Sequence, residues 1–178
     1  MSALLSTIIV GVSLSMDAFS LALAYGTYGL SNKEKILLSI IVGCFHFFMP
    51  LLGLYLGNLI FSYFVFNIRF VVAVIFAIIG ISMIISSIND NEERIMVSLI
   101  GFLLFGMSVS IDSFTTGIGL NSINSNYLQV SSIFMILSGI FTYFGLNLGL
   151  VLNREFGKWS TFIGGIVLIF MGLYYLLN

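Results

Sequence analysis

Six apolar stretches, each about as long as a membrane is thick, occupy most of this 178-residue chain. They cover residues 5–26, 36–62, 70–88, 97–120, 130–152 and 159–177. A helix of about 20 residues spans the roughly 30 Å hydrocarbon core of a bilayer. Open strands cannot cross lipid, because their backbone groups would have no hydrogen-bond partners there. The sequence therefore predicts an all-α integral membrane protein with six transmembrane helices.

Composition excludes several other classes of protein. Hydrophobic residues make up 60% of the chain and charged residues 7%, whereas a soluble domain has about a quarter of its residues charged. Six Lys and Arg against seven Asp and Glu leave no basic surface for nucleic acid. The single cysteine, Cys44, excludes disulfides and cysteine-based metal motifs. We expect one transmembrane domain over residues 1–178, with the lipid bilayer as its surroundings.

Basic residues in the short loops predict the orientation. Five of them fall in breaks on one side of the predicted membrane, and only Arg69 falls on the other. Because basic loops stay in the cytoplasm, both termini are predicted to lie outside. The acidic loop between the third and fourth runs is expected to be a solvated connection. The five basic residues are Lys33, Lys35, Arg94, Arg154 and Lys158, and the acidic ones are Asp90, Glu92 and Glu93.

The two halves of the chain resemble each other. Residues 13–20 (SLSMDAFS) recur as residues 108–115 (SVSIDSFT), at an offset of 95. The second and fifth runs share glycines and phenylalanines at an offset of 96, while the third and sixth share little beyond Gly80 and Gly172. Each half holds three helices, an odd number, so the second half enters the membrane with the opposite orientation. The sequence thus predicts two inverted three-helix repeats, residues 1–90 and 95–178.

An aspartate lies deep in the first run and another at the matching place in the fourth. A charged carboxylate at the bilayer centre costs at least about 2.5 to 3.5 kcal/mol, so Asp17 and Asp112 are expected to face protein or water. Helical residues four before and three after an aspartate lie within about 60° of it. Hydroxyl side chains therefore share each aspartate's face, namely Ser13, Ser20, Ser108 and Thr115, with Thr116 extending the second stripe.

Two carboxylates among hydroxyl oxygens suit a hard divalent cation such as Mn²⁺ or Mg²⁺. Without the metal, two close carboxylates would not both ionise easily, so one is expected to take up a proton. Binding metal in one state and a proton in the other is the chemistry of an exchanger. A purely structural alternative remains, in which the aspartates form a hydrogen-bonded pair between helices and the hydroxyls bond back to their own helix.

Two further side chains are candidate ligands. His46, in the second run, could bind metal or relay protons, or could be a core histidine with one satisfied bond. Asn147, in the fifth run, offers a neutral oxygen, or could be a packing amide.

Four segments resemble the bacterial MntP-type manganese efflux pumps: residues 15–19 (SMDAF), 45–53 (FHFFMPLLG), 110–114 (SIDSF) and 164–168 (GGIVL). The resemblance implies a pump in the bacterial plasma membrane that exports Mn²⁺ as its substrate and needs no cofactor. It matches Asp17 and Asp112 to the aspartates of the family motifs. Family members often carry further acidic residues in the second and third helices, where this chain has His46 and Ser86–Ser87.

Other functions stay open at this point. The wider superfamily includes exporters of other solutes and non-transporting proteins of membrane assembly or sporulation. A pair of membrane aspartates also occurs in intramembrane aspartyl proteases, but Met16–Asp17 and Ile111–Asp112 lack their Tyr-Asp and Gly-x-Gly-Asp motifs. No Gly-x-x-x-x-Gly-Lys-Ser/Thr loop is present for ATP. We therefore expect a transporter driven by an ion gradient rather than an enzyme.

Overall fold

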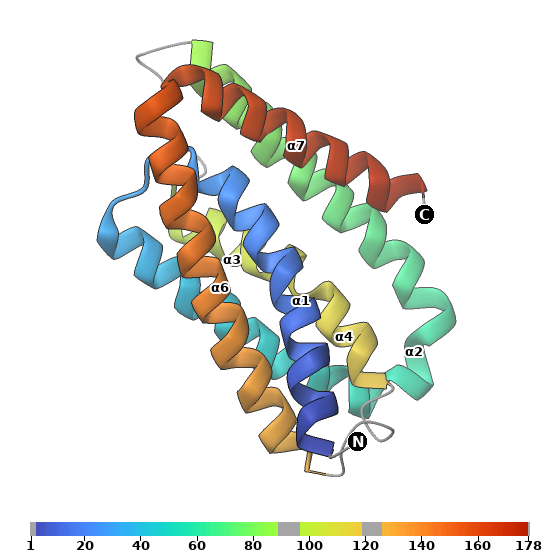
Figure 1. The fold of residues 1–178 in the computed structure, drawn as a ribbon. Coiled ribbons are helices and arrows are strands. Elements are labelled where there is room, and N and C mark those ends of the chain that lie inside the picture. Colours follow the sequence, from blue (N-terminus) through green and yellow to red (C-terminus); the bar gives the residue numbers. More distant parts are fainter. Residues whose placement is uncertain (1–2, 89–96, 119–125, 178) are drawn as a thin grey trace.

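The computed structural model describes residues 3–88, 97–118 and 126–177, with side chains except at 56–69, 71–72 and 175–176. The described residues form helices and no strand (Figure 1). The helices are α1 (Ala3–Gly26), α2 (Asn32–Ile88), α3 (Leu99–Val109), α4 (Ile111–Ile118), α6 (Tyr127–Phe156) and α7 (Lys158–Leu177). The predicted acidic loop with Asp90, Glu92, Glu93 and Arg94 lies outside the described residues.

Four helical segments are long and apolar enough to cross a membrane: Ala3–Gly26, Asn32–Tyr55, Leu99–Ile118 and Tyr127–Phe156. Two further segments, Ala73–Ile88 and Lys158–Tyr174, are apolar but shorter. The predicted class, an all-α membrane protein, is confirmed.

The break expected between residues 62 and 70 is absent from the backbone, because α2 stays helical from Asn32 to Ile88. Between Gly57 and Gly80 the chain has neither glycine nor proline, and the polar residues there do not end a helix by themselves. The helix instead bends back on itself, so that its two ends form separate arms (Figure 1). We call residues 32–55 the first arm and residues 73–88 the second arm.

Local capping explains two of the helix ends. The polar break predicted after the first run is where α2 begins: the Ser31 N–H donates to Glu34 Oε2 at 2.7 Å, and the Glu34 N–H to Ser31 Oγ at 3.4 Å. This reciprocal pair is a capping box. At the other connection α6 ends at Gly157, whose φ of +56° favours glycine. Its N–H donates to Asn153 O at 2.7 Å.

Close helix crossings depend on glycines. α1 packs along α6, and the second arm of α2 runs beside α7 (Figure 1). A Cβ added to Gly145 would lie 2.6 Å from Phe19 O, so α1 and α6 meet backbone to backbone. The second arm and α7 meet at Gly80 and Gly165, where a Cβ on Gly165 would lie 2.6 Å from Gly80 O. Small residues are the usual means of close packing in membranes, where no hydrophobic effect drives helices together.

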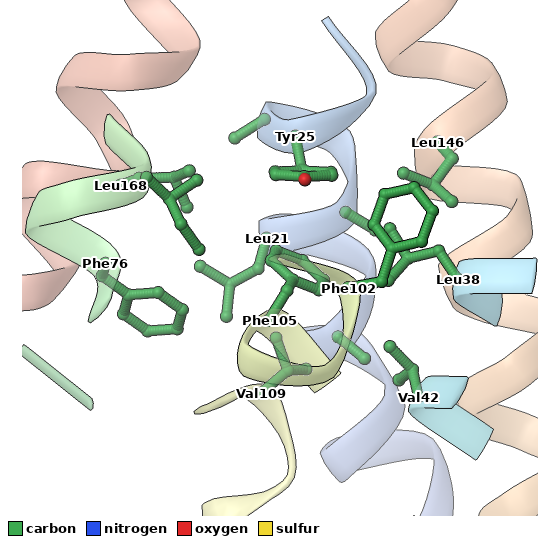
Figure 2. Packing of buried hydrophobic residues seen from close by; sticks show 14 of the residues in the cluster. Leu21, Tyr25, Leu38, Val42, Phe76, Phe102, Phe105, Val109, Leu146 and Leu168 are labelled. Carbon is green, nitrogen blue, oxygen red and sulfur yellow. The ribbon is translucent and has the colours of Figure 1, made fainter. Parts of the chain in front are cut away.

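The main core is a cluster of buried apolar side chains from all six described helices (Figure 2). It surrounds Tyr25 on α1 and includes Phe102 and Phe105 of α3. Phe76 from the second arm and Leu168 from α7 complete it on one side. A much smaller cluster, Leu14, Val130 and Phe134, lies nearer the start of α1. The core is therefore concentrated toward the C-terminal end of α1.

The crossing of α1 and α6 gives a stability prediction. Gly145→Ala places a methyl group 2.6 Å from Phe19 O, and α1 must move to admit it. Overpacking of this kind costs about 1 to 3 kcal/mol. In detergent, we expect the thermal unfolding midpoint of this variant to fall.

Gly139→Ala in the same helix is the matched control, because its nearest neighbour, Ser39 O, is 3.4 Å away. Its midpoint is expected to stay or to rise, since alanine favours helix over glycine by about 1 kcal/mol. Equal thermal unfolding midpoints for Gly145→Ala and Gly139→Ala would contradict the close crossing of α1 and α6 at Gly145.

Candidate functional site

Asp17 lies on a polar face of α1. Ser13, Asp17 and Ser20 are all exposed, and they lie on the same side of the helix as their spacing requires. The helix is unbroken around them. Asp17 is thus held on a regular helix and faces open space rather than packed side chains.

Asp112 lies just after a break in the fourth apolar run, which was expected to be a single helix over residues 97–120. The structure has α3 and α4 there, separated by Ser110. The Ser113 N–H donates to Ser110 O at 3.1 Å, three residues back, instead of to the carbonyl four residues back. This tighter turn starts α4, and half-buried Asp112 occupies its first turn. A carboxylate there is stabilised by the positive end of the helix dipole.

Neighbouring contacts place the two aspartates at the same depth. Helix α1 runs antiparallel to α3 and α4 (Figure 1), and the rings of Tyr25 and Phe105 meet with centroids 4.8 Å apart. Asp17 lies eight residues before Tyr25, and Asp112 lies seven residues after Phe105. At 1.5 Å per residue these separations are about 12 Å and about 10 Å in the same direction. The two carboxyl groups are also within electrostatic range of each other.

Four of the five predicted hydroxyl ligands donate their protons within their own helices. Ser13 Oγ donates to Ile9 O at 3.0 Å and Ser20 Oγ to Met16 O at 2.9 Å. In the other half, Ser108 Oγ donates to Leu104 O at 2.8 Å and Thr116 Oγ1 to Asp112 O at 2.9 Å. Ser108 is buried, whereas Thr115 is exposed. With the protons used in this way, these side chains can offer only oxygen lone pairs to a ligand.

His46 is buried in the first arm of α2, with only 1% of its surface exposed. Its Nδ1 lies 2.9 Å from Val42 O. A carbonyl oxygen can only accept, so Nδ1 carries the proton, and the neutral ring presents a lone pair on Nε2. The face that carries His46 also carries Gly43, which packs on α6, and Pro50, which packs on Gly117 of α4.

Asn147 has partners that the sequence analysis missed. Its Oδ1 accepts a hydrogen bond of 2.6 Å from Lys35 Nζ, and its Nδ2 donates to Tyr143 O at 2.7 Å. Lys35, assigned to a loop by the sequence, is instead inside the first turns of α2 and only 2% exposed. The Asn147 oxygen is therefore occupied by an ammonium group in this structure. The sequence could have indicated this contact through a predicted helix start at Asn32, because a helix that begins there turns the Lys35 side chain toward α6.

Three buried hydroxyls also escaped the sequence analysis: those of Ser113, Ser131 and Thr142 have no hydrogen-bond partner in the described structure. Ser113 follows Asp112 directly. Among the described residues no three His, Cys, Asp or Glu side chains come together as a metal site. The candidate site is therefore an aspartate pair with hydroxyl oxygens, and His46 lies buried on another helix, α2.

Comparison with known proteins gives a consistent result. A family profile described as "Putative manganese efflux pump" matches residues 29–176. A relative from Bacillus pumilus, "Putative manganese efflux pump MntP", is 33% identical over 96% of this chain and 93% of its own length. Relatives with the same name from Halalkalibacterium halodurans and Bacillus thuringiensis are each 30% identical, over 98% and 97% of this chain and 97% and 96% of their own lengths. No solved structure matches the chain.

The family profile covers most of the chain, and the relatives align with it almost from end to end. The relatives' alignments extend over the helices that carry both aspartates, whereas the profile begins at residue 29 and covers Asp112 but not Asp17. The chain belongs to the MntP family of manganese efflux pumps, which are transporters rather than enzymes.

Proposed function

We propose that this protein is a secondary transporter that exports Mn²⁺ from the cytoplasm and holds the ion between Asp17 and Asp112. The observation that carries the proposal is the placement of these two carboxyl groups at one depth, within electrostatic range of each other. Two negative charges balance one dication, and carboxylate and hydroxyl oxygens suit Mn²⁺. The relatives' name, manganese efflux pump, supports this choice of metal.

The exposure of Asp17 supports a water-accessible site. A charged side chain at the middle of a span does not face hydrocarbon, because its insertion cost is too high. The open face of α1, with Ser13, Asp17 and Ser20, is therefore a candidate wall of an aqueous path. The break before Asp112 resembles the discontinuous helices that form ion sites in other secondary transporters.

Six membrane spans arranged as two inverted repeats form the proposed architecture. In this arrangement the spans are α1, the two arms of α2, α3 with α4, α6, and α7. Contacts between the first arm and α6 support it: a Cβ on Gly43 would lie 3.0 Å from Met135 O, and one on Gly139 would lie 3.4 Å from Ser39 O. Both glycines and both carbonyls are related by the offset of 96. Such paired contacts are expected of a pseudo-twofold axis in the membrane plane.

Proton exchange is the proposed source of energy. When Mn²⁺ leaves, the two neighbouring carboxylates have no positive charge between them, and protonation of one of them relieves the repulsion. A proton gradient directed into the cell would then drive the empty carrier back. The chain offers no phosphate-binding loop for ATP.

The basic residues give the proposed orientation in the bacterial plasma membrane. Lys33 and Lys35 follow α1, while Arg154 and Lys158 flank the turn between α6 and α7. These connections lie at the same end of the molecule (Figure 1). Basic ends stay in the cytoplasm, so both termini are placed outside.

The first prediction removes one charge at a time. Asp17→Asn or Asp112→Asn keeps the shape of the side chain but leaves one negative charge for a dication. We expect either variant to sensitise cells to excess Mn²⁺ as strongly as deletion of the gene, and to raise their Mn content. Metal content measured by mass spectrometry, including Mg, Fe, Co and Zn, checks both the effect and the choice of metal.

Glu155→Gln is the matched control, because it makes the same chemical change on an exposed residue at the end of α6. Equal membrane levels of all three variants are verified by immunoblot. Normal Mn²⁺ tolerance in either aspartate variant would overturn the proposed site. A rise in the cellular content of another solute, without a rise in Mn, would show that this other solute is the substrate.

The second prediction concerns energy coupling. In everted membrane vesicles, we expect uptake of Mn²⁺ to increase when the lumen is made acidic relative to the outside, because protons then leave as the metal enters. Dissipation of the pH difference with nigericin is expected to abolish this increase. A rate that is indifferent to the imposed pH gradient would exclude proton exchange.

A further inference from the structure

Burial changes abruptly along α1. Between Leu21 and Tyr28 every described side chain is buried except Leu23, which is half-buried, so this part of the helix is enclosed on all sides. Between Ala3 and Ser20 the helix has an open face with Ile9, Met16 and Asp17. Asp17 therefore lies near the boundary between an open and a closed part of the molecule.

Tyr25 occupies the centre of the closed part. Its side chain has no exposed surface, and its ring meets Phe105 at 4.8 Å, Tyr28 at 5.5 Å and Phe102 at 6.4 Å between centroids. Figure 2 shows the ring within the cluster, with Leu168 on one side and Leu146 on the other. The rings of Tyr25, Phe102 and Phe105 thus join α1 to α3 above the aspartate pair. We call these three side chains the aromatic plug.

Hydrogen bonds fasten α1 just beyond the plug. Thr27 O accepts from Asn153 Nδ2 and from Thr161 Oγ1, both at 2.7 Å, which ties the end of α1 to α6 and α7. Tyr28 Oη donates to Ser82 Oγ at 3.1 Å and ties it to the second arm of α2. Each of these bonds is made by one or two side chains, whereas the glycine crossings bring backbone against backbone.

We infer that Tyr25 is the gate that closes the metal path on the side of the basic loops. This inference rests on the proposed function and orientation, which make that side the cytoplasm. Tyr25 is eight residues, or about 12 Å, from Asp17, and among the described residues the buried cluster lies on one side of Asp17 while the exposed face of α1 lies on the other. Loading from the cytoplasm requires that Tyr25 part from Phe105, and release outside requires that the two rings meet again.

The plug is apolar, and this chemistry suits a gate. Aromatic rings exclude water and hold no dication, so the metal is retained by Asp17 and Asp112 and not by the seal. A transporter with a failed seal on one side would let Mn²⁺ run down its gradient without an exchanged ion.

Cross-linking tests the gate directly. In a Cys44→Ser background, which removes the single cysteine, Tyr25→Cys and Phe105→Cys are combined in the full chain and reconstituted into liposomes. A short bis-methanethiosulfonate reagent is chosen because the two rings meet at 4.8 Å. Because the unbridged double variant lacks both rings, we expect it to pass Mn²⁺, bridging to stop this flux, and dithiothreitol to restore it. Each single-cysteine variant treated in the same way controls for simple modification.

Removal of an aromatic ring is the complementary test, because it is expected to open the seal, whereas cross-linking is expected to lock it. We expect Tyr25→Ala to give a passive Mn²⁺ flux in liposomes without any opposing gradient, and Tyr25→Phe, which keeps the ring, to give none. Phe105→Ala removes the facing ring and serves if Tyr25→Ala does not fold. Addition of Asp17→Asn to the leaking variant is expected to stop the flux, because the leak still passes the metal site.

Failure of the gate can be distinguished from failure of the proposed function. If Asp17→Asn abolishes transport but the bridged protein transports at the unbridged rate, Tyr25 is not the gate and the metal site stands. If Asp17→Asn transports Mn²⁺ normally, the proposed function itself is wrong. A folded Tyr25→Ala or Phe105→Ala variant that is inactive and does not leak would also overturn the gate.

Discussion

Two carboxylates cannot remain charged side by side within a membrane unless something positive joins them, and the rest of the structure depends on this constraint. Asp17 and Asp112 come from different halves of the chain yet lie at one depth and within electrostatic range. Either a proton or a cation must offset their repulsion. A protein that alternates between the protonated and the metal-bound state of this pair transports the cation. The proposed exchange is based on this alternation.

Close helix crossings at glycines position the two helices that carry the aspartates, α1 and α4. The contact of Gly145 with Phe19 O fixes the height of α1 against α6, and that of Gly117 with Pro50 fixes α4 against the first arm of α2. Because both contacts are between backbones, neither helix can slide without a clash. The joint between α1 and α3 is different in kind, because it is made of aromatic rings. The described bundle therefore combines backbone-to-backbone crossings at glycines with an aromatic contact between α1 and α3, where the proposed gate lies.

Sequence reasoning reached the helical class because it depends on a local property, the length of the apolar runs. The cost of a charge in lipid singled out Asp17 and Asp112, which stay the proposed site. Sequence reasoning failed where the outcome depends on three-dimensional packing. A break was expected at residues 62–70, yet these residues include no glycine or proline and α2 stays helical through them. The break at Ser110 likewise has no glycine or proline between Gly106 and Gly117 to announce it. Lys35 was read as a loop residue, and only the start of α2 reveals that it binds Asn147. The hydroxyls of Ser113 and Thr142 carry no local signal of being buried without partners.

The most direct test of the central claim is the stoichiometry of Mn²⁺ binding to the purified protein, followed by electron paramagnetic resonance of the free ion. If the two carboxylates jointly hold the metal, the unaltered chain binds one Mn²⁺. Asp17→Asn and Asp112→Asn would each bind none at the same free concentration, while remaining folded by circular dichroism. Undiminished binding in both variants would contradict the account, because the ion would then be held without the aspartate pair.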